Sequence, residues 1–276
     1  MATLPRSAKS SSDWTRNELL AYNITVSSQS PEAFYLQPLP ELASLATDSG
    51  FDPNLLSGTL STQGLSRETH RLLEYLDMAS RPNSNQESAV HDFAKEILRA
   101  LGYELRGSLL RSHYVIPLLI SGDQTRSAQT SVCLVQGRSG IILIPMVHED
   151  KTTVDPEPQV IASAIATFQY NNRIRARFGK QELDSMSIPC ITMSGTRPTF
   201  YVVPVTRELS EAVHTGRYPA STTVVKKCVV VSNSGRLSEG MESPDFRQVA
   251  IQHYVSFDPF AIIHWDNVKV PAGAMI

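Results

Sequence analysis

The residues best suited to chemistry lie where an apolar run ends abruptly in charge. The run 141–148 is Ile-Ile-Leu-Ile-Pro-Met-Val-His, and Glu149, Asp150 and Lys151 follow it. A short apolar run bounded by Gly140 and a polar cluster predicts a buried strand. Because side chains alternate along a strand, we expect Glu149 and Lys151 on one face. A carboxylate and an ammonium so placed suit a metal ion and a phosphodiester, although a strand that simply leaves the core would have the same sequence.

Two helices are predicted ahead of this strand. The first begins at Ser66, a good N-cap residue, and extends to about residue 79 with leucines at helical spacing. The second, from about 86 to 101, has apolar residues three and four apart and stops at Gly102. Glu87 falls in the first turn of the second helix, where the helix dipole favours a carboxylate. That role suffices for Glu87 unless it faces a site.

An antiparallel meander is predicted between the second helix and residue 151. Ser131 falls on its second strand and Asp123 in the turn before that strand. Pro117 and Pro145 lack a backbone donor, so we expect each at an edge or a bulge. Turns are predicted at 121–124 and 137–140, between strands at 113–120, 129–136 and the opening run.

A long helix is predicted after the meander. Asp155 is a plausible N-cap, Pro156 fits the first helical position, and Gln159 lies early in the helix, which is expected to stop at Gly179. Three arginines, Arg173, Arg175 and Arg177, occupy its last turns. They either complement the helix dipole or contact phosphates, and the two roles carry equal weight. The remaining predicted elements are strands at 189–193, 199–205 and 224–231 and helices at 207–215 and 243–253.

The composition is that of an ordinary globular protein. The 276 residues are 41% hydrophobic and 19% charged, with a formal net charge of −2, so a strongly basic nucleic-acid binder is not indicated. Cys133, Cys190 and Cys228 lie far apart in apolar segments and are expected to be reduced core thiols. Residues 1–80 are interpreted as an N-terminal extension and helical cover, and residues 81–276 as the main α/β domain with a C-terminal helical segment.

Several function classes lack their sequence signals. The chain has no glycine-rich phosphate loop, no HxxxH or CxxC pair and no GxSxG motif. The first 12 residues contain no apolar core of a signal peptide, and no apolar run is long enough to span a membrane. We therefore expect a cytoplasmic or nuclear protein without a signal peptide and without a membrane partner.

The predicted order from residue 86 is helix, three strands, helix, strand. With a Glu in the first helix and Glu-x-Lys ending the third strand, residues 85–205 resemble the PD-(D/E)XK nuclease-like fold. The resemblance implies an α/β (α+β) fold, a mixed central sheet with an αβββαβ restriction-endonuclease-like core flanked by helices. Nearly the whole chain also resembles a group of fungal, basidiomycete-type proteins through phrases such as Trp14-Thr-Arg-Asn-Glu-Leu-Leu-Ala-Tyr-Asn and Glu149-Asp-Lys. That second resemblance implies little about function.

The nuclease resemblance also implies a set of site residues. Glu87 and Glu149 correspond to metal ligands, Lys151 to the residue that orients or activates the attacking water, and Gln159 to a frequent fourth member. Mg²⁺ would be the metal, because a hard cation prefers carboxylate oxygens and water. The principal Asp of the second strand is replaced by Ser131, which removes a full negative charge. Asp123 could substitute only in a different register, and Asp150 only through its backbone carbonyl.

Three hypotheses follow from these residues. The first is a nuclease-like protein with weakened or lost cleavage that still binds nucleic acid or a protein partner, with Arg173, Arg175 and Arg177 contacting DNA or RNA. The second is an active Mg²⁺-dependent nuclease that uses Glu87, Glu149 and Asp123 or Asp150. The third is a non-catalytic protein-interaction domain, in which case no metal is required. Salt-dependent binding to nucleic acid separates the first from the third.

Overall fold

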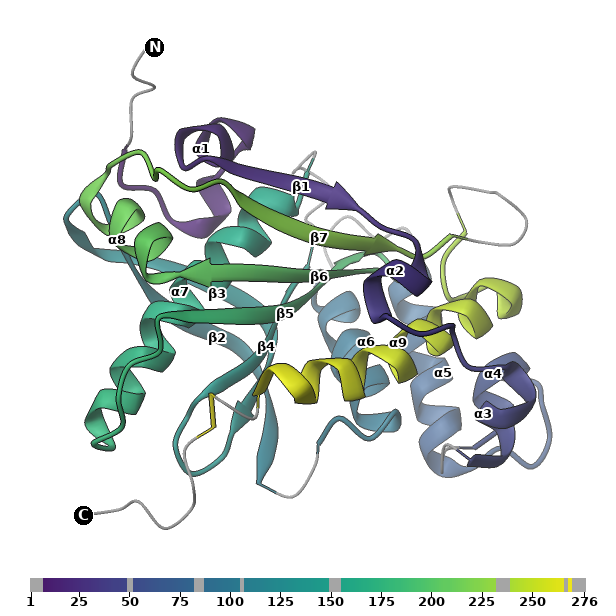
Figure 1. The fold of residues 1–276 in the computed structure, drawn as a ribbon. Helices are drawn as coiled ribbons and strands as arrows, with labels where there is room; N and C mark the ends of the chain where they lie inside the picture. The colour runs from purple at the N-terminus through teal and green to yellow at the C-terminus, as the bar shows by residue number, and fades with distance from the viewer. Residues whose placement is uncertain are drawn as a thin grey trace.

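The computed structural model describes residues 7–48, 52–81, 87–104, 107–148, 155–231, 239–265 and 268–269. It is a mixed α/β structure built on one seven-stranded sheet (Figure 1). In spatial order the strands are β1 (Ile24–Ser28), β7 (Thr223–Val229), β6 (Arg197–Thr206), β5 (Ser185–Ser194), β4 (Ile142–His148), β3 (Asp123–Gln136) and β2 (Ser108–Ile120).

Helices cover both faces of the sheet and one end of it. They are a short 3-10 turn η1 (Ser11–Asp13), α1 (Arg16–Ala21), α2 (Pro31–Tyr35), α3 (Leu42–Asp48), α4 (Asn54–Ser57), α5 (Arg67–Ser80), α6 (Glu87–Ala100), α7 (Glu157–Arg177), α8 (Arg207–Thr215) and α9 (Pro244–Trp265).

The sheet combines an antiparallel meander with parallel pairings. Strands β2, β3 and β4 pair antiparallel in sequence order, as predicted. The chain then passes through α7 and returns as β5, which pairs parallel to β4. Strands β5, β6 and β7 form a second antiparallel run, and β1 adds to β7 in parallel. Parallel neighbours need a long crossover, and α7 supplies it.

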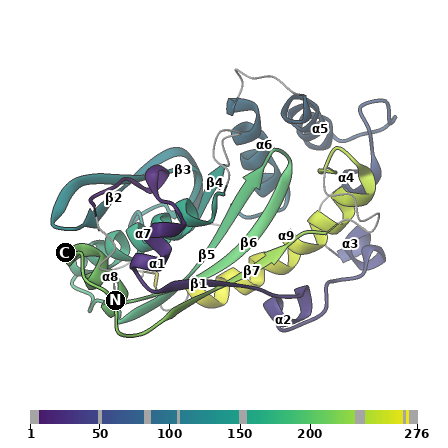
Figure 2. The same ribbon diagram turned by 90° about the horizontal axis from the view of Figure 1, so that it is seen from above.

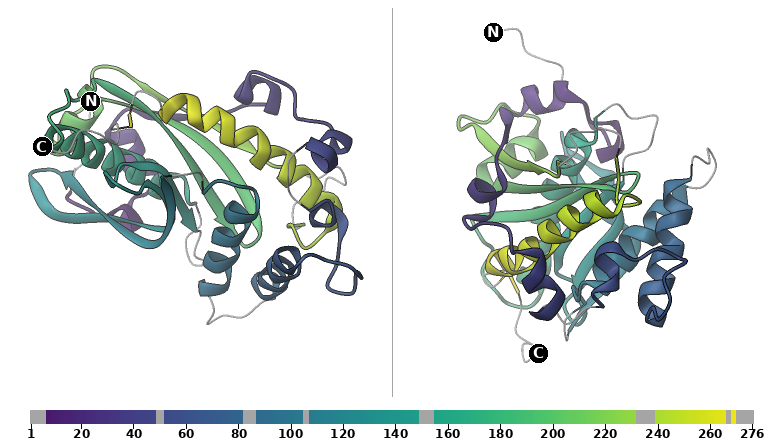
Figure 3. Two further views of the ribbon diagram at one scale, coloured as in Figure 1. Left: turned by 90° about the horizontal axis from the view of Figure 1, so that it is seen from below. Right: turned by 90° about the vertical axis from the view of Figure 1, so that its right-hand side faces the viewer.

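The helices α7 and α9 lie on opposite faces of this sheet. Phe200 of β6 packs on Phe257 of α9 with ring centroids 4.9 Å apart. Its neighbour Tyr201 lies beside Lys227, which pairs with Glu157 of α7. Adjacent residues of a strand point to opposite faces, so the two helices are separated by the sheet. Figures 2 and 3 show α7 beside the curved β2–β3 hairpin and α9 across the other face.

Helix α7 forms the centre of its layer because it is apolar on nearly every side. Thirteen of its 21 residues are buried, which is typical of a helix enclosed by a protein core. Three amide side chains fix it in place, and each bonds both the N–H and the C=O of one backbone residue. Gln169 binds Leu119, Asn171 binds Ile142, and Asn172 binds Leu183. Backbone groups that lack a strand partner are thereby satisfied.

Several predicted element ends are confirmed and others are wrong. The Ser66 side chain accepts a hydrogen bond from the Thr69 N–H and caps α5, as expected. Helix α7 begins one residue later than predicted, at Glu157 with Pro156 as the N-cap, while Asp155 Oδ1 accepts from the Glu157 N–H. Helix α9 extends twelve residues beyond its predicted end, through Pro259, because Phe257, Ala261 and Trp265 continue a buried face.

The N-terminal region contributes more to the sheet than a cover would. Strand β1, which sequence patterns did not predict, forms one edge of the sheet within residues 1–80. Pro117 lies on the opposite edge strand, β2, and Pro145 lies in β4 close to the register shift between Leu134 and Val135. All three cysteines are free and buried, as predicted. Within the described ranges, no helix is both long and apolar enough to cross a membrane.

Candidate functional site

The structure shows the surroundings of the predicted site, while its two central residues lie outside the described ranges. Strand β4 is described to His148, the chain resumes at Asp155, and Glu149 and Lys151 fall between them. Glu87 is the first residue of α6, but its side chain is likewise outside the described set. The geometry of the site therefore comes from β3, from the start of α7 and from the N-terminal segment.

Ser131 lies on β3 beside the end of β4. It precedes Val132, whose cross-strand partner is Met146 of β4. Its neighbours Thr130 and Val132 pair with Tyr114 and Ser112 of β2, respectively. Tyr114 bonds Tyr170 of α7 and Ser112 bonds Lys95 of α6, so Ser131 lies where the hairpin passes between these two helices. A half-buried neutral hydroxyl thus occupies this position next to the end of β4.

Asp123 lies far from Ser131. It starts β3 at the β2–β3 turn, where it pairs with Ile120. Its carboxylate accepts hydrogen bonds from the N–H and hydroxyl of Thr125 and from Arg126 Nε, and these bonds lower the pKa of Asp123. Eight residues of strand separate it from Ser131, or roughly 27 Å. The register that would bring Asp123 to the end of β4 does not occur.

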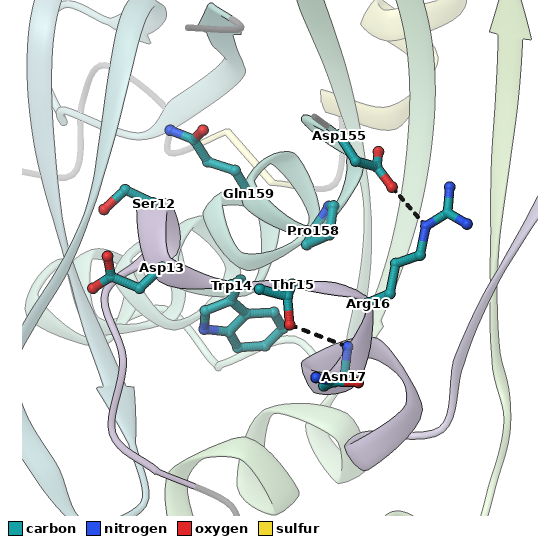
Figure 4. A pocket seen from close by; sticks show the side chains of 9 residues that line it. All are labelled: Ser12, Asp13, Trp14, Thr15, Arg16, Asn17, Asp155, Pro158 and Gln159. Atoms are coloured by element: carbon teal, nitrogen blue, oxygen red, sulfur yellow. Dashed lines mark hydrogen bonds and ion pairs between the residues drawn. The ribbon is translucent and has the colours of Figure 1, made fainter. Parts of the chain in front are cut away.

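A cavity of about 670 Å³ opens at the N-terminal end of α7 (Figure 4). One wall comes from Asp155, two residues before α7, and from the first turn of α7, including the predicted Gln159, and the other comes from the N-terminal segment. The wall positions carry hydroxyl, amide, carboxylate, guanidinium and indole groups. The lining residues are Ser12, Asp13, Trp14, Thr15, Arg16, Asn17, Asp155, Pro158 and Gln159.

The N-terminal wall is held by local bonds that the sequence encodes. Thr15 caps α1, and Glu18 completes a capping box by accepting from the Thr15 N–H and hydroxyl. Lys9 Nζ donates to Glu18 Oε1 at 2.6 Å. Burial alone would raise the pKa of Glu18, but the bonds from Lys9 and Thr15 lower it overall. Trp14 stacks on Tyr22 with centroids 5.6 Å apart, which anchors the segment.

Ion pairs neutralise the carboxylates at the start of α7. Arg16 Nε donates to Asp155 Oδ2 at 2.8 Å across the mouth of the cavity. Glu157 forms an ion pair with Lys227 of β7, and the Lys227 ammonium lies 6.0 Å from the centroid of the Tyr201 ring. Carboxylates in the first turn suit the positive end of the helix dipole. Asp155 and Glu157 thus each have a cationic partner.

The three predicted arginines lie at the other end of α7. Gln159 precedes Arg173 by 14 residues, or roughly 21 Å of helix. Arg175 bonds the carbonyls of Gln181 and Val268, and burial lowers its pKa. Arg173 and Arg177 are exposed. The structure therefore separates the arginines from the Gln159 cavity, and it gives Arg175 a structural role.

Within the described residues, no three His, Cys, Asp or Glu side chains are close enough to hold a metal ion together. Ser131 and Gln159 themselves supply a neutral hydroxyl and a neutral amide, so these two residues do not by themselves fit Mg²⁺, which prefers carboxylate oxygens. The sequence argument missed the N-terminal wall of the cavity, although Trp14 and the Thr15-x-x-Glu18 capping box signal an anchored helix start.

No family model matches this chain, and no curated protein matches it.

Proposed function

We propose that this chain is a nuclease-like protein of the PD-(D/E)XK type whose metal-dependent phosphodiester cleavage is weakened or lost and which retains binding to nucleic acid. The order and pairing of six elements support this function above all. Among the described residues, helix α6, the antiparallel strands β2, β3 and β4, the crossover helix α7 and the parallel strand β5 follow one another in this order. That is the αβββαβ arrangement to which Glu149, Lys151 and Gln159 are assigned.

The chemistry at Ser131 supports the loss of cleavage. A divalent cation at this place would polarise a phosphate and lower the pKa of its bound water, which requires anionic ligands. Ser131 supplies no negative charge, and Asp123 lies roughly 27 Å away along β3. In this proposal Lys151 and Gln159 remain able to contact a phosphate, whereas Glu87 and Glu149 hold Mg²⁺ weakly or not at all.

Restoring the charge at residue 131 tests this function. We expect the wild-type chain to bind DNA or RNA oligonucleotides without cleaving them in Mg²⁺ or Mn²⁺. Ser131→Asp should gain Mn²⁺ binding measured by calorimetry, and cleavage if the other groups are in place. Ser131→Asn, which has nearly the same size and no charge, should gain neither. Robust wild-type cleavage that Lys151→Ala abolishes would show that catalysis has not been lost.

A protein-interaction role is the second candidate, and exposed apolar side chains near β1 favour it. Leu20, Leu36 and Val224 are 61%, 80% and 49% exposed, respectively. Val224 pairs with Thr25 of β1, and β1 is an edge strand of the sheet. Exposed apolar groups beside an edge strand are typical of contact surfaces. Light scattering of the wild type and of Leu36→Ser across a concentration series distinguishes a self-associating chain from a monomer.

A further inference from the structure

Two arginines and two tyrosines form a continuous row between β2 and α7. The Arg111 guanidinium carbon lies 5.6 Å from the centroid of the Tyr114 ring, and that of Arg173 lies 5.4 Å from the Tyr170 ring. The two hydroxyl groups are 3.0 Å apart and share a hydrogen bond. The tyrosine rings are 6.4 Å apart and nearly perpendicular. The row therefore runs guanidinium, ring, ring, guanidinium.

An unusual backbone conformation brings the β2 half of this row together. Regular alternation would put Arg111 and Tyr114 on opposite faces of β2. His113 between them has a φ of 49°, in the left-handed region that non-glycine residues seldom adopt. The alternation is broken there, and both side chains reach the same side of the strand. Such conformations persist where surrounding structure holds them, and they occur often at functional positions.

The guanidinium groups of the row are exposed and carry uncompensated charge. Arg111, Arg173 and Arg177 are exposed, and none of them has an ion-pair partner among the described residues. Arg177 lies one helical turn beyond Arg173 on the same face of α7. By contrast, carboxylates pair with Arg16, Arg71, Arg81, Arg99, Arg126 and Arg207.

The tyrosine rings are half-buried, and each has an arginine over it. Burial, together with the hydrogen bond to Tyr170, raises the pKa of Tyr114, so this ring adds no negative charge. A planar guanidinium supported by a ring can stack on a second planar group with its outer face. Unpaired bases are such groups, whereas bases inside a duplex are not accessible for stacking.

We propose that Arg111, Tyr114, Tyr170, Arg173 and Arg177 form a binding strip for single-stranded nucleic acid. Bases stack on the ring-supported Arg111 and Arg173 guanidiniums, and phosphates contact these groups and Arg177. The steps of 5.6, 6.4 and 5.4 Å each exceed the rise of about 3.4 Å between stacked nucleotides, so the strip spans several nucleotides. This inference rests on the proposed nucleic-acid binding. Of the three α7 arginines predicted to contact nucleic acid, the strip keeps Arg173 and Arg177, and Arg111 of β2 takes the place of Arg175.

The strip also approaches the candidate site. Arg111 is the cross-strand partner of Cys133, which lies two residues from Ser131 along β3. In the β2–β3 ladder Arg111 and Ser131 are therefore diagonal neighbours, roughly 7 Å apart. A strand held by stacking on Arg111 would therefore pass close to residue 131. This arrangement explains why a chain of near-neutral net charge can bind nucleic acid through a local basic surface.

Fluorescence polarisation with labelled 20-nucleotide single strands and the matching duplexes tests the strip. We expect the wild type to bind single strands about tenfold more tightly than duplexes, because stacking on each base contributes only when bases are unpaired. Arg111→Gln combined with Arg173→Gln should weaken single-strand binding about tenfold or more. The slope of log K against log salt should also become shallower by about 1.4, because two phosphate contacts are lost.

Two further double variants separate stacking from charge. Arg111→Lys with Arg173→Lys keeps both charges but lacks the planar group, so it should lose the preference for single strands while keeping the salt slope. Arg67→Gln with Arg81→Gln makes the same charge change at the two ends of α5, on the other side of the molecule in Figure 1, and should bind like the wild type.

Each alternative result has a definite meaning. If Arg111→Gln with Arg173→Gln binds single strands as tightly as the wild type does, the strip is wrong while the proposed nucleic-acid binding stands. If Arg111→Lys with Arg173→Lys keeps the full single-strand preference, stacking on guanidinium groups is wrong. If the wild type binds no nucleic acid at low salt, the strip and the proposed function are both overturned.

Discussion

The two faces of the sheet differ in how their buried polar groups are paired. On the α7 face, Asn171 bonds both backbone groups of Ile142, and Glu157 is paired with Lys227. On the α9 face, His253 is 1% exposed and lies among aromatic rings, and Asp258 Oδ1 has no hydrogen-bond partner among the described residues. The polar groups named on the α7 face are thus paired, whereas on the α9 face His253 is enclosed by aromatic rings and one oxygen of the partly buried Asp258 is unpaired among the described residues.

The pKa values of His253 and Asp258 on the α9 face reflect this difference. Burial lowers the pKa of His253 to about 4, although the Glu32 charge opposes the shift, and burial raises the pKa of Asp258 to about 6, although Lys269 opposes it. The His253 ring is held neutral, with Nδ1 3.1 Å from the Tyr35 hydroxyl and 3.8 Å from Cys228 Sγ. We infer that hydrogen bonds determine the stability of the α7 face and that pH acts mainly through the α9 face.

The largest effect is expected from breaking an amide clamp on the α7 face. Asn171→Ala leaves the buried N–H and C=O of Ile142 without their partner, and we expect the free energy of unfolding to fall by about 3 kcal/mol. Gln169→Ala breaks the same two bonds at Leu119, which lies on the edge strand β2 and is half-exposed. Water can replace those bonds, so Gln169→Ala should lower the free energy of unfolding by only about 1 kcal/mol. Urea unfolding of both variants measures the difference, and equal costs would contradict the role of burial.

A smaller effect is expected from acid on the α9 face. The folded pKa of His253 is depressed from 6.5 to about 4, so its contribution to stability is complete above pH 6.5 and is lost as pH falls toward 4. The loss should reach about 2 kcal/mol at pH 5. Urea unfolding at pH 7 and pH 5 measures it, and His253→Gln should remove this part of the pH dependence.

His70 supplies the control for this experiment. It is an exposed histidine on α5, 3.7 Å from Glu74, and His70→Gln is the matched variant with which the pH dependence of His253→Gln is compared. An unchanged dependence in His253→Gln would mean that the buried ring does not remain neutral in the folded protein. In that case the two faces of the sheet would not differ in how the protonation of a buried group affects stability.

The parts of the fold that sequence patterns predicted are those with strong local signals. The Ser66 cap marks the start of α5, and short turns between apolar segments marked the β2–β3–β4 meander. Strand β1 was missed because its five residues, Ile-Thr-Val-Ser-Ser, are mostly exposed and are ordered by long-range pairing with β7. The end of α9 was missed because Pro259 is normally a stop signal, which tertiary packing overrides here.

The candidate site was predictable only where it depends on position along one strand or helix. Ser131 on β3 and Gln159 early in α7 have the places that the sequence indicated. The separation of Gln159 from Arg173 follows from the helix rise and could have been derived from the sequence. The contact of Arg111 with Tyr114 and of Tyr114 with Tyr170 could not have been derived from the sequence, because it depends on the φ of His113 and on contact between β2 and α7.

The smallest effect is expected from Asp258, and it has the opposite sign. A carboxyl group whose folded pKa is raised from 3.8 to about 6 destabilises the protein above pH 6, and this penalty disappears as pH falls toward 3.8. Asp258→Asn should therefore raise the free energy of unfolding by about 1 kcal/mol at pH 7.5, after discounting for partial exposure, and by much less at pH 4.5. Asp245→Asn on the exposed first turn of the same helix should instead lower stability slightly, because it removes a favourable charge from the N-terminal end of α9. Thermal unfolding of both variants at the two pH values measures these changes. Stabilisation by Asp258→Asn that persists at pH 4.5 would mean that packing, not the buried charge, distinguishes this face.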